Sequence, residues 1–383
     1  MASLILFANP RAGSTLAKEY LQLPDGQAYV TVEGREIRLL VFDLLDAGSK
    51  SIGLQAVREA ANSTAEVRVL VAGGDGSLIW LLQDLVHAGV PLDRVVISPL
   101  PFGTGNDLAA TLGWGRKPNT PLLGINLEVA VKDWALAQPE AFDVWEVDLQ
   151  LSEAGYFTQV AREATGFRKT VVQSEGIAKT RLTRLMSNYF SLGVDARIGL
   201  GFDKARTRSQ VRNKMVYAWE GFKKLCCLPV TELQDFLHRF EDLDPSAPKL
   251  ICDADSLPLP DTFVTIIAQN ITTYAASDHQ LWANAYANVG KLEPQHQTSS
   301  DGLLEFLTFP AGFGIALEQV PMMRGNARRL HQGRGPFHLQ TGGKTVYLNI
   351  DGEYYAAQGL ESVTVRLWPQ SQQVRVLRKP NYR

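Results

Sequence analysis

The chain has 383 residues, of which 45% are hydrophobic and 20% are charged, with a formal net charge of −2. This length is sufficient for two hydrophobic cores, and no apolar run approaches the roughly 18 residues that a membrane-spanning helix needs. The three cysteines have neither Cys-x-x-Cys spacing nor nearby histidines, which disfavours a zinc site. Residues 1–8 lack the basic leader and long apolar core of a signal peptide, so we expect a cytoplasmic protein that meets membranes transiently, at its surface.

The first part of the chain alternates short apolar runs with helical patterns. The apolar runs predict strands at 4–8, 38–42, 67–71 and 95–100, and the helical patterns lie between them, for example at 52–60 and 78–86. Thr120 and Pro121 predict the N-cap and first turn of a further helix that ends near Ala135, which places a domain boundary near Pro139. The alternation predicts a parallel α/β domain whose ligands bind at the carboxyl ends of the strands.

The second part of the chain alternates apolar and polar residues with period two. Such runs occur at 142–151, 262–269, 303–309, 345–350 and 361–367. One helical pattern, at about 211–225, interrupts them. Strands without intervening helices predict an antiparallel β domain.

Two glycine-rich turns each follow a predicted strand and open a helix. The first is Gly73-Gly74-Asp75-Gly76-Ser77, and the second is Gly103-Thr104-Gly105-Asn106. Because glycine has no Cβ, the backbone there can bring its N–H groups against a phosphate. We therefore expect two phosphate cradles side by side at one edge of the sheet, as in a nucleotide-dependent kinase. Neither a Walker A sequence nor a dinucleotide-binding fingerprint is present, which disfavours phosphate-loop NTPases and dehydrogenases.

Asp75 is the only acid in the first turn. A carboxylate among amides that face phosphate opposes the charge of the ligand unless a metal or a transferable proton intervenes, so we interpret Asp75 as a catalytic group. The alternative is that Asp75 caps the helix that begins near Ser77. Asp107 precedes Leu108 and an alanine pair, and we interpret it as a helix N-cap without a catalytic role.

A third phosphate element follows the first strand. Asn9-Pro10-Arg11-Ala12-Gly13-Ser14 turns the chain sharply and places a guanidinium beside amides at a helix start, an arrangement that suits a nucleotide phosphate.

These motifs resemble the catalytic domain of eukaryotic-type diacylglycerol kinases. The resemblance rests on residues 73–77 with Trp80, on 101–109 and on Leu112-Gly113-Trp114-Gly115. The Gly-Gly-Asp-Gly sequence at 73–76 is by itself less specific, because sphingosine kinases, NAD kinases and phosphofructokinases share it. Later stretches are similar to the accessory domain of the same family: 188–196, 201–202, 212–218, 300–305 and 349–353. The resemblance therefore covers nearly the whole chain.

The resemblance implies an α/β plus β fold. Its parts are an N-terminal Rossmann-like parallel α/β catalytic domain over 1–138, a C-terminal antiparallel β-sandwich accessory domain over 139–383, and a nucleotide site in the cleft between them. The implied activity is ATP-dependent phosphorylation of diacylglycerol to phosphatidic acid, with Mg²⁺, at a membrane surface. A sphingosine- or ceramide-type lipid kinase is the alternative, which Trp80 and Gly113-Trp114-Gly115 disfavour; an NAD kinase is disfavoured by the apolar accessory domain. A catalytically silent lipid- or nucleotide-binding scaffold is disfavoured because the candidate acids are all present. The oligomeric state and the acyl-chain preference stay open.

The resemblance also implies roles for individual residues. The nucleotide-binding residues are Asn9, Arg11, Gly73, Gly74, Gly76, Ser77, Thr104, Gly105, Asn106 and Glu353. Asp351 is expected to reach magnesium directly or through water, because hard cations prefer carboxylates and waters. The acceptor of the alcohol proton is Asp75 or Asp301, and we favour Asp75. Without the resemblance, Asp301-Gly302 and Asp351-Gly352 indicate hairpin turns.

The charge distribution and one departure from the family add to these expectations. Residues 160–224 carry 14 basic and 5 acidic side chains, an excess of +9 that favours anionic head groups or ATP, or else is balanced by nearby acids. Within this stretch, Asp195 and 212–214 are candidates for contacts with the nucleotide or a head group. No nucleic-acid motif accompanies the charge. Where the family has a glycine cluster, 272–282 carries Ala275 and Ala276, which leaves open a different lipid site and another hydroxylated lipid as substrate.

Overall fold

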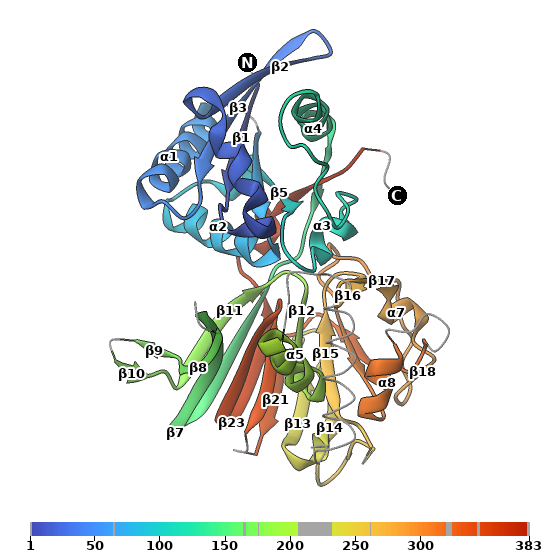
Figure 1. Ribbon diagram of the computed structural model, residues 1–383. Coiled ribbons are helices and arrows are strands. Elements are labelled where there is room, and N and C mark those ends of the chain that lie inside the picture. The colour runs from blue at the N-terminus through green and yellow to red at the C-terminus, as the bar shows by residue number, and fades with distance from the viewer. Residues whose placement is uncertain are drawn as a thin grey trace. The chain divides into compact units, whose positions relative to one another are not determined.

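The computed structural model describes residues 2–63, 66–163, 166–174, 176–205, 232–260, 262–318, 324–342 and 345–380. The chain forms two compact units (Figure 1). The first contains Met1–Asp143, Thr273–Asp278 and Pro369–Arg383, and the second contains Val144–Thr272 and His279–Trp368. This division differs from the expected continuous segments 1–138 and 139–383, because two later segments return to the first unit. The helix expected at 211–225 lies outside the described residues.

The first unit is built on a seven-stranded sheet with the order β2-β3-β1-β4-β5-β24-β6. Its strands are β1 (Ala2–Ala8), β2 (Gln27–Val32), β3 (Arg35–Asp43), β4 (Val67–Gly73), β5 (Val95–Pro101), β6 (Gln138–Ala141) and β24 (Arg375–Arg378). The five inner strands pair in parallel; four of them, β1, β3, β4 and β5, were predicted by the alternating pattern, and β24 was not. The edge strands β2 and β6 pair antiparallel and were not predicted.

Helices cover this sheet. They are α1 (Ala47–Ser63), α2 (Asp75–His87), α3 (Asp107–Thr111) and α4 (Ile125–Leu136), with 3-10 segments at Ala12–Gln22, Pro24–Gly26, Leu92–Arg94 and Ser371–Gln373. The apolar side of α2 buries Leu78, Leu82 and Leu85, which follow the helical repeat. The expected start of α4 at Thr120 is wrong, because the helix begins after Gly124, whose φ of 67° suits glycine.

The second unit is built on a 13-stranded sheet. Its strands are β7 (Trp145–Glu163), β8 (Gly166–Val171), β11 (Arg181–Met186), β12 (Tyr189–Gly193), β13 (Leu237–Asp242), β14 (Lys249–Asp253), β15 (Thr265–Gln269), β18 (Ala287–Asn288), β19 (Leu304–Thr308), β20 (Arg328–Gly333), β21 (Phe337–Thr341), β22 (Val346–Ile350) and β23 (Glu353–Leu367). Smaller elements of this unit are α5 (Val194–Ala205), α7 (Leu281–Asn284), α8 (Gly312–Leu317), β9 (Gln173–Ser174), β10 (Ile177–Ala178) and a 3-10 turn at Leu233–Asp235. The short strand β16 (Thr273–Tyr274) belongs to the first unit, and β17 (Ser277–Gln280) begins there and ends in the second unit. Apart from the parallel pair β18 and β20, the described pairs of the large sheet are antiparallel. This confirms the antiparallel β character expected from the period-two runs.

The long strands β7 and β23 let this sheet curl. The first half of β23 pairs with β22 and its second half with β21, and the pairing with β7 shifts register around Leu360. Such irregularities bend a strand and increase its twist. The inner face of the curled sheet then packs against itself: the ring centroid of Phe306 lies 4.9 Å from that of Phe240 and 4.6 Å from that of Phe337.

Candidate functional site

The three predicted phosphate elements follow neighbouring strands of the first sheet. The chain continues from β1 to β3 on one side and then crosses to β4 on the other side, so the strand order reverses at β1. Ligands of open α/β sheets bind outside the carboxyl ends of the strands at such a reversal. The Asn9 loop follows β1 and the first glycine turn follows β4, on the two sides of this point.

The two glycine turns lie side by side, as expected. The Phe102 N–H donates to the Gly73 carbonyl oxygen at 3.1 Å. A Cβ added to Gly103 would lie 2.6 Å from the Gly74 Cα, far below ordinary contact. The absence of side chains at Gly74 and Gly103 therefore lets the two backbones touch.

Asn9 joins the first loop to the first glycine turn. Its backbone N–H donates to the Ala72 carbonyl oxygen at 2.9 Å, and its side-chain Nδ2 donates to Ser77 Oγ at 3.4 Å. Its Oδ1 accepts the Arg11 N–H at 3.0 Å, which closes the loop, while the Arg11 side chain is exposed. Ser77 is 6% exposed and fills the space beside Gly73, where a Cβ would lie 2.5 Å from the Ser77 side chain.

Gly76 has a different environment from Gly73. It lies in the first turn of α2, and apart from its chain neighbours and the backbone of its own helix no atom lies within 4 Å of the position that its Cβ would occupy. The first N–H groups of a 13-residue helix are positively polarised and lack intrahelical acceptors. Packing does not require a glycine at this position, so the open space is available to a ligand.

Asp75 holds the second glycine turn. Its Oδ2 accepts the N–H groups of Asp107 at 3.0 Å and Leu108 at 3.4 Å. Asp75 therefore caps α3, the helix of the neighbouring loop, whereas the considered alternative was a cap on its own helix. The two turns are thus joined through a charged side chain as well as through their backbones.

The N-cap interpretation of Asp107 is wrong. α3 begins at Asp107 itself, with Asn106 at the N-cap position. The buried Asp107 carboxylate instead accepts Arg116 Nη1 at 2.8 Å and the Ala276 N–H at 3.0 and 3.1 Å from its two oxygens. It therefore fastens the segment 273–278 to the first unit. Sequence reasoning missed Arg116 and the contact of this segment with Asp107, since no motif in either points to Asp107.

The second turn divides into inner and outer residues. Asn106 is 2% exposed, has a φ of 53°, and donates from Nδ2 to the carbonyl oxygens of Gly103 and Arg116, while its Oδ1 accepts the Gly103 N–H. Its side chain therefore shapes the turn. The Gly105 carbonyl oxygen accepts Arg116 Nη1, and Thr104 is exposed. Thr104 is the residue of this turn whose side chain is open to a ligand.

Asp351, in the second unit, is held by donors. Its oxygens accept the N–H groups of Ser187 at 2.6 Å, Asn188 at 2.8 Å and Tyr189 at 3.0 Å, and the Ser187 hydroxyl at 2.9 Å. Burial raises the pKa of this carboxyl to about 6, although the same hydrogen bonds favour the charged form and so lower the pKa. A carboxylate has about four lone-pair sites. Four donors occupy them, so this arrangement does not fit direct contact of Asp351 with magnesium, which was one of the two expected modes of contact.

The other predicted acids of the second unit lie in separate surroundings. The Asp301 Oδ1 accepts the Leu303 N–H at 3.0 Å, the turn that Asp-Gly favours, and Gly302 has a φ of 69°. Glu353 accepts the Tyr355 hydroxyl at 2.5 Å and lies 3.9 Å from Arg184. Asp75 and Asp301 belong to different units.

Asp195 does not fit a ligand contact. It is 3% exposed and accepts the hydroxyls of Ser191 at 2.5 Å and of Thr265. The other candidates of this stretch, 212–214, lie outside the described residues. Among the described residues, His, Cys, Asp and Glu side chains form no group of three or more that could hold a metal ion. In the same part of the chain, no helix has the length and apolar character needed to cross a membrane.

The chain matches two family models. The diacylglycerol kinase catalytic domain matches residues 3–144, and the diacylglycerol kinase accessory domain matches residues 185–354. These two ranges contain both glycine turns and the strands around Asp351.

Curated proteins with the same name are similar to the chain. Diacylglycerol kinase iota of Mus musculus is 30% identical over 370 residues, which are 92% of this chain and 29% of the relative. Diacylglycerol kinase zeta of Homo sapiens is 28% identical over 365 residues, 92% of this chain and 33% of the relative. Diacylglycerol kinase 4 of Arabidopsis thaliana is 25% identical over 388 residues, 91% of this chain and 76% of the relative. The chain thus spans about a third or less of the iota and zeta relatives. Its domain matches and its likeness over most of its length show that the chain belongs to the diacylglycerol kinase family.

Proposed function

We propose that the chain is an ATP-dependent lipid kinase that transfers the γ-phosphate of ATP to the free hydroxyl of diacylglycerol, forming phosphatidic acid. The observation that carries the proposal is the contact between the two glycine turns where the strand order reverses. The names of the relatives supply the acceptor, because each is a diacylglycerol kinase.

The nucleotide phosphates would bind at the start of α2. Gly76 leaves the space there open, and the exposed side chains of Arg11 and Thr104 lie on the two flanking loops. An arginine beside amides at a helix start suits the charge and geometry of phosphate. Asn9, Gly73, Gly74, Ser77, Gly105 and Asn106 act indirectly in this proposal, by holding the shape of the loops.

Phosphoryl transfer depends mainly on positioning and on stabilising charge. In the proposed reaction, the lipid hydroxyl oxygen bonds to the γ-phosphorus while the bond from that phosphorus to the β,γ-bridging oxygen breaks, and ADP leaves. A carboxylate takes the hydroxyl proton. We assign this role to Asp75, at the phosphate turn, with Asp301 as the alternative, because a general base must lie within hydrogen-bond reach of the hydroxyl.

The proposal also includes the domain folds, the position of the nucleotide site and the membrane association that the family resemblance implies. They are a Rossmann-like first domain, a β-sandwich second domain, a nucleotide site in the cleft between the domains with Glu353 contributing to it, and transient association with the membrane that holds the lipid. Magnesium is expected with ATP in this family, where it is usually held partly by the phosphates themselves. The surroundings of Asp351 do not support a direct role for that residue.

Gly76→Ala tests the nucleotide half of the proposal. An added methyl group would enter the space assigned to phosphate, so the Kd for ATP should rise by about tenfold, the loss of roughly one charge-assisted hydrogen bond. Gly48→Ala, in the first turn of α1, is the matched control, with its nearest neighbour 3.5 Å from the added Cβ. Alanine favours a helix over glycine, so neither variant should unfold at a lower temperature. An unchanged Kd in Gly76→Ala would contradict the phosphate assignment.

The acceptor is tested with labelled ATP and magnesium. Micelles of diacylglycerol, sphingosine or ceramide, and dissolved NAD, are supplied in parallel, and we expect label in phosphatidic acid. Label in a sphingoid or ceramide product would show that this lipid, and not diacylglycerol, is the substrate. ATP binding without any labelled product would favour a silent scaffold and would overturn the proposed activity.

A further inference from the structure

A small hairpin forms an excursion of the second unit between β8 and β11 (Figure 1). Its strands β9 and β10 pair with each other, Ile177 with Ser174, and belong to neither large sheet. Backbone hydrogen bonds fasten its base to β7, because the Val172 N–H donates to the Phe157 carbonyl oxygen and the Leu151 N–H to the Thr180 carbonyl oxygen, both at 2.8 Å. The base is therefore ordered by the sheet.

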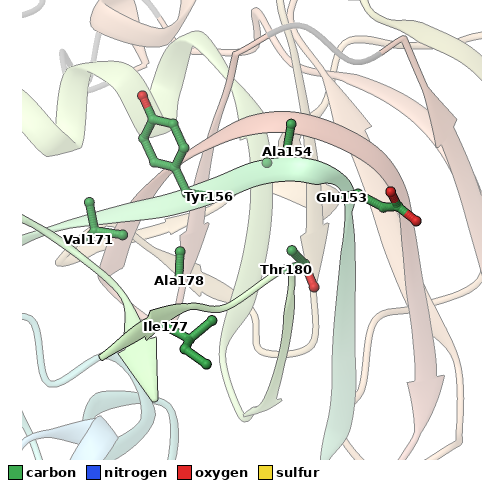
Figure 2. A pocket seen from close by; sticks show the side chains of 8 residues that line it. Glu153, Ala154, Tyr156, Val171, Ile177, Ala178 and Thr180 are labelled. Carbon is green, nitrogen blue, oxygen red and sulfur yellow. The ribbon is translucent and has the colours of Figure 1, made fainter. Parts of the chain in front are cut away.

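Apolar side chains gather around a hollow beside this hairpin. Figure 2 shows the hollow, which has a volume of about 400 Å³, with Tyr156 and Val171 at one side and Ile177 on the hairpin. Ile177 is 74% exposed, Tyr156 41% and Val171 39%. These are three of six large hydrophobic side chains that are exposed in the described part of the second unit. Single exposed apolar residues are ordinary, whereas large contiguous groups of them are typical of interaction surfaces.

The charge of this region complements an anionic partner. Residues 166–180 contain Arg168, Lys169 and Lys179 against one acid, Glu175. They belong to the stretch 160–224, whose excess of +9 contrasts with the net charge of −2 of the whole chain. Glu153 lines the hollow, and Figure 2 shows its carboxylate at the end far from Tyr156 and Val171. Basic residues near an apolar anchor are typical of surfaces that bind anionic lipid.

We propose that this hairpin docks the protein on an anionic lipid bilayer, with the Ile177 side chain entering the head-group layer and Lys179 beside it facing lipid phosphates. The choice of a bilayer rests on the proposed function, whose acceptor is a membrane lipid. The alternatives, a second copy of the chain or a peptide in the hollow, are outcomes of the test below.

Vesicle sedimentation tests the proposal without using kinase activity. The purified chain is mixed, without ATP, with phosphatidylcholine vesicles that contain or lack about a third of phosphatidylserine. We expect preferential binding to the anionic vesicles, a loss of at least tenfold in partitioning for Ile177→Asp, and a loss of about fivefold for Lys179→Ala. Ile125→Asp is the matched control, because Ile125 is 73% exposed but lies in the first unit, and it should bind as the unaltered chain does.

Further measurements separate the possible failures. Ile177→Asp should keep the unfolding temperature of the unaltered chain, because the replaced side chain is mostly exposed. It should also keep turnover on dissolved short-chain diacylglycerol while losing turnover on vesicles. If no alcohol is phosphorylated, the proposed function fails, and the vesicle binding still decides this inference. Three outcomes would each overturn the docking proposal. They are equal vesicle binding by Ile177→Asp and the unaltered chain, equal losses of vesicle binding in Ile177→Asp and Ile125→Asp, and a lipid-free dimer that Ile177→Asp dissociates.

Discussion

Polar side chains at the glycine turns bind the backbone of the turns. Asn106 uses both ends of its amide on Gly103, and Asp75 binds the start of α3. In a sequence pattern, residues of these types beside glycines indicate ligand contacts. The same donors and acceptors also satisfy buried backbone groups, and a buried amide without a partner costs about 1–3 kcal/mol. The roles of these residues are therefore divided between shaping the site and binding a ligand.

Asp75→Asn separates the two roles of Asp75. The asparagine Oδ1 can still accept the N–H groups of Asp107 and Leu108, so the unfolding temperature should fall by only a few degrees. Loss of the proton acceptor should lower kcat by about 10²–10⁴-fold, with a smaller effect on the KM for ATP. Asp301→Asn, which can keep the turn to Leu303, is the matched control and should keep kcat within about threefold. Near-normal turnover in Asp75→Asn together with a large loss in Asp301→Asn would move the role to Asp301.

At the scale of elements, α3 is the junction of the first unit. The N–H of its first residue, Asp107, donates to Asp75, and the Asp107 carboxylate accepts the N–H of Ala276. At its end, the Thr111 hydroxyl lies 3.1 Å from the Thr273 hydroxyl. The segment 273–278 lies where the resemblance predicts a glycine cluster. Ala275 and Ala276 have φ values of 52° and 59°, so they keep a left-handed backbone although they are not glycines. Contacts with α3 compensate for the strain of this backbone conformation in alanine.

Ala276→Gly should relieve this strain. A left-handed backbone costs alanine about 1–2 kcal/mol of folding free energy, which glycine avoids. Glycine also gives the unfolded chain more conformational entropy, which offsets about 0.4–1 kcal/mol of this gain in stability. The variant should therefore be as stable as the unaltered chain or up to about 1 kcal/mol more stable in thermal unfolding. Ala56→Gly, in the middle of α1, is the control and should lose about 1 kcal/mol. Equal losses in the two variants would show that the left-handed backbone carries no strain.

At the scale of the whole molecule, the first sheet depends on the end of the chain. β24 pairs in parallel with β5 and antiparallel with β6, and its Leu377 is fully buried. Trp114, in a family motif, donates from Nε1 to the Leu377 carbonyl oxygen at 2.8 Å. The unit that holds the glycine turns is therefore completed only when residues far along the chain have been added. A fragment that ends at the expected boundary lacks this inner strand.

Leu377→Ala tests this dependence. Removing a fully buried leucine side chain costs about 2–5 kcal/mol, so the unfolding of the first unit, followed by circular dichroism, should shift down by several degrees. ATP binding at the lower temperature should persist, since β24 carries none of the phosphate-binding residues. Leu45→Ala, where the leucine is 41% exposed, should change the midpoint by no more than about a degree. Equal midpoints in the two variants would contradict a stabilising role of β24.

The sequence by itself determined the inner strands β1, β3, β4 and β5, the helices α1 and α2, the antiparallel character of the second unit and the adjacency of the glycine turns. Each follows from a local pattern, because period and glycine placement act within a few residues. Only the tertiary structure decided that β24 completes the first sheet, that Asp75 caps α3, that Asp107 binds Ala276 and that donors surround Asp351. These contacts join residues about 30 to 280 positions apart, and no local period or motif encodes which distant backbone group a buried polar side chain will find.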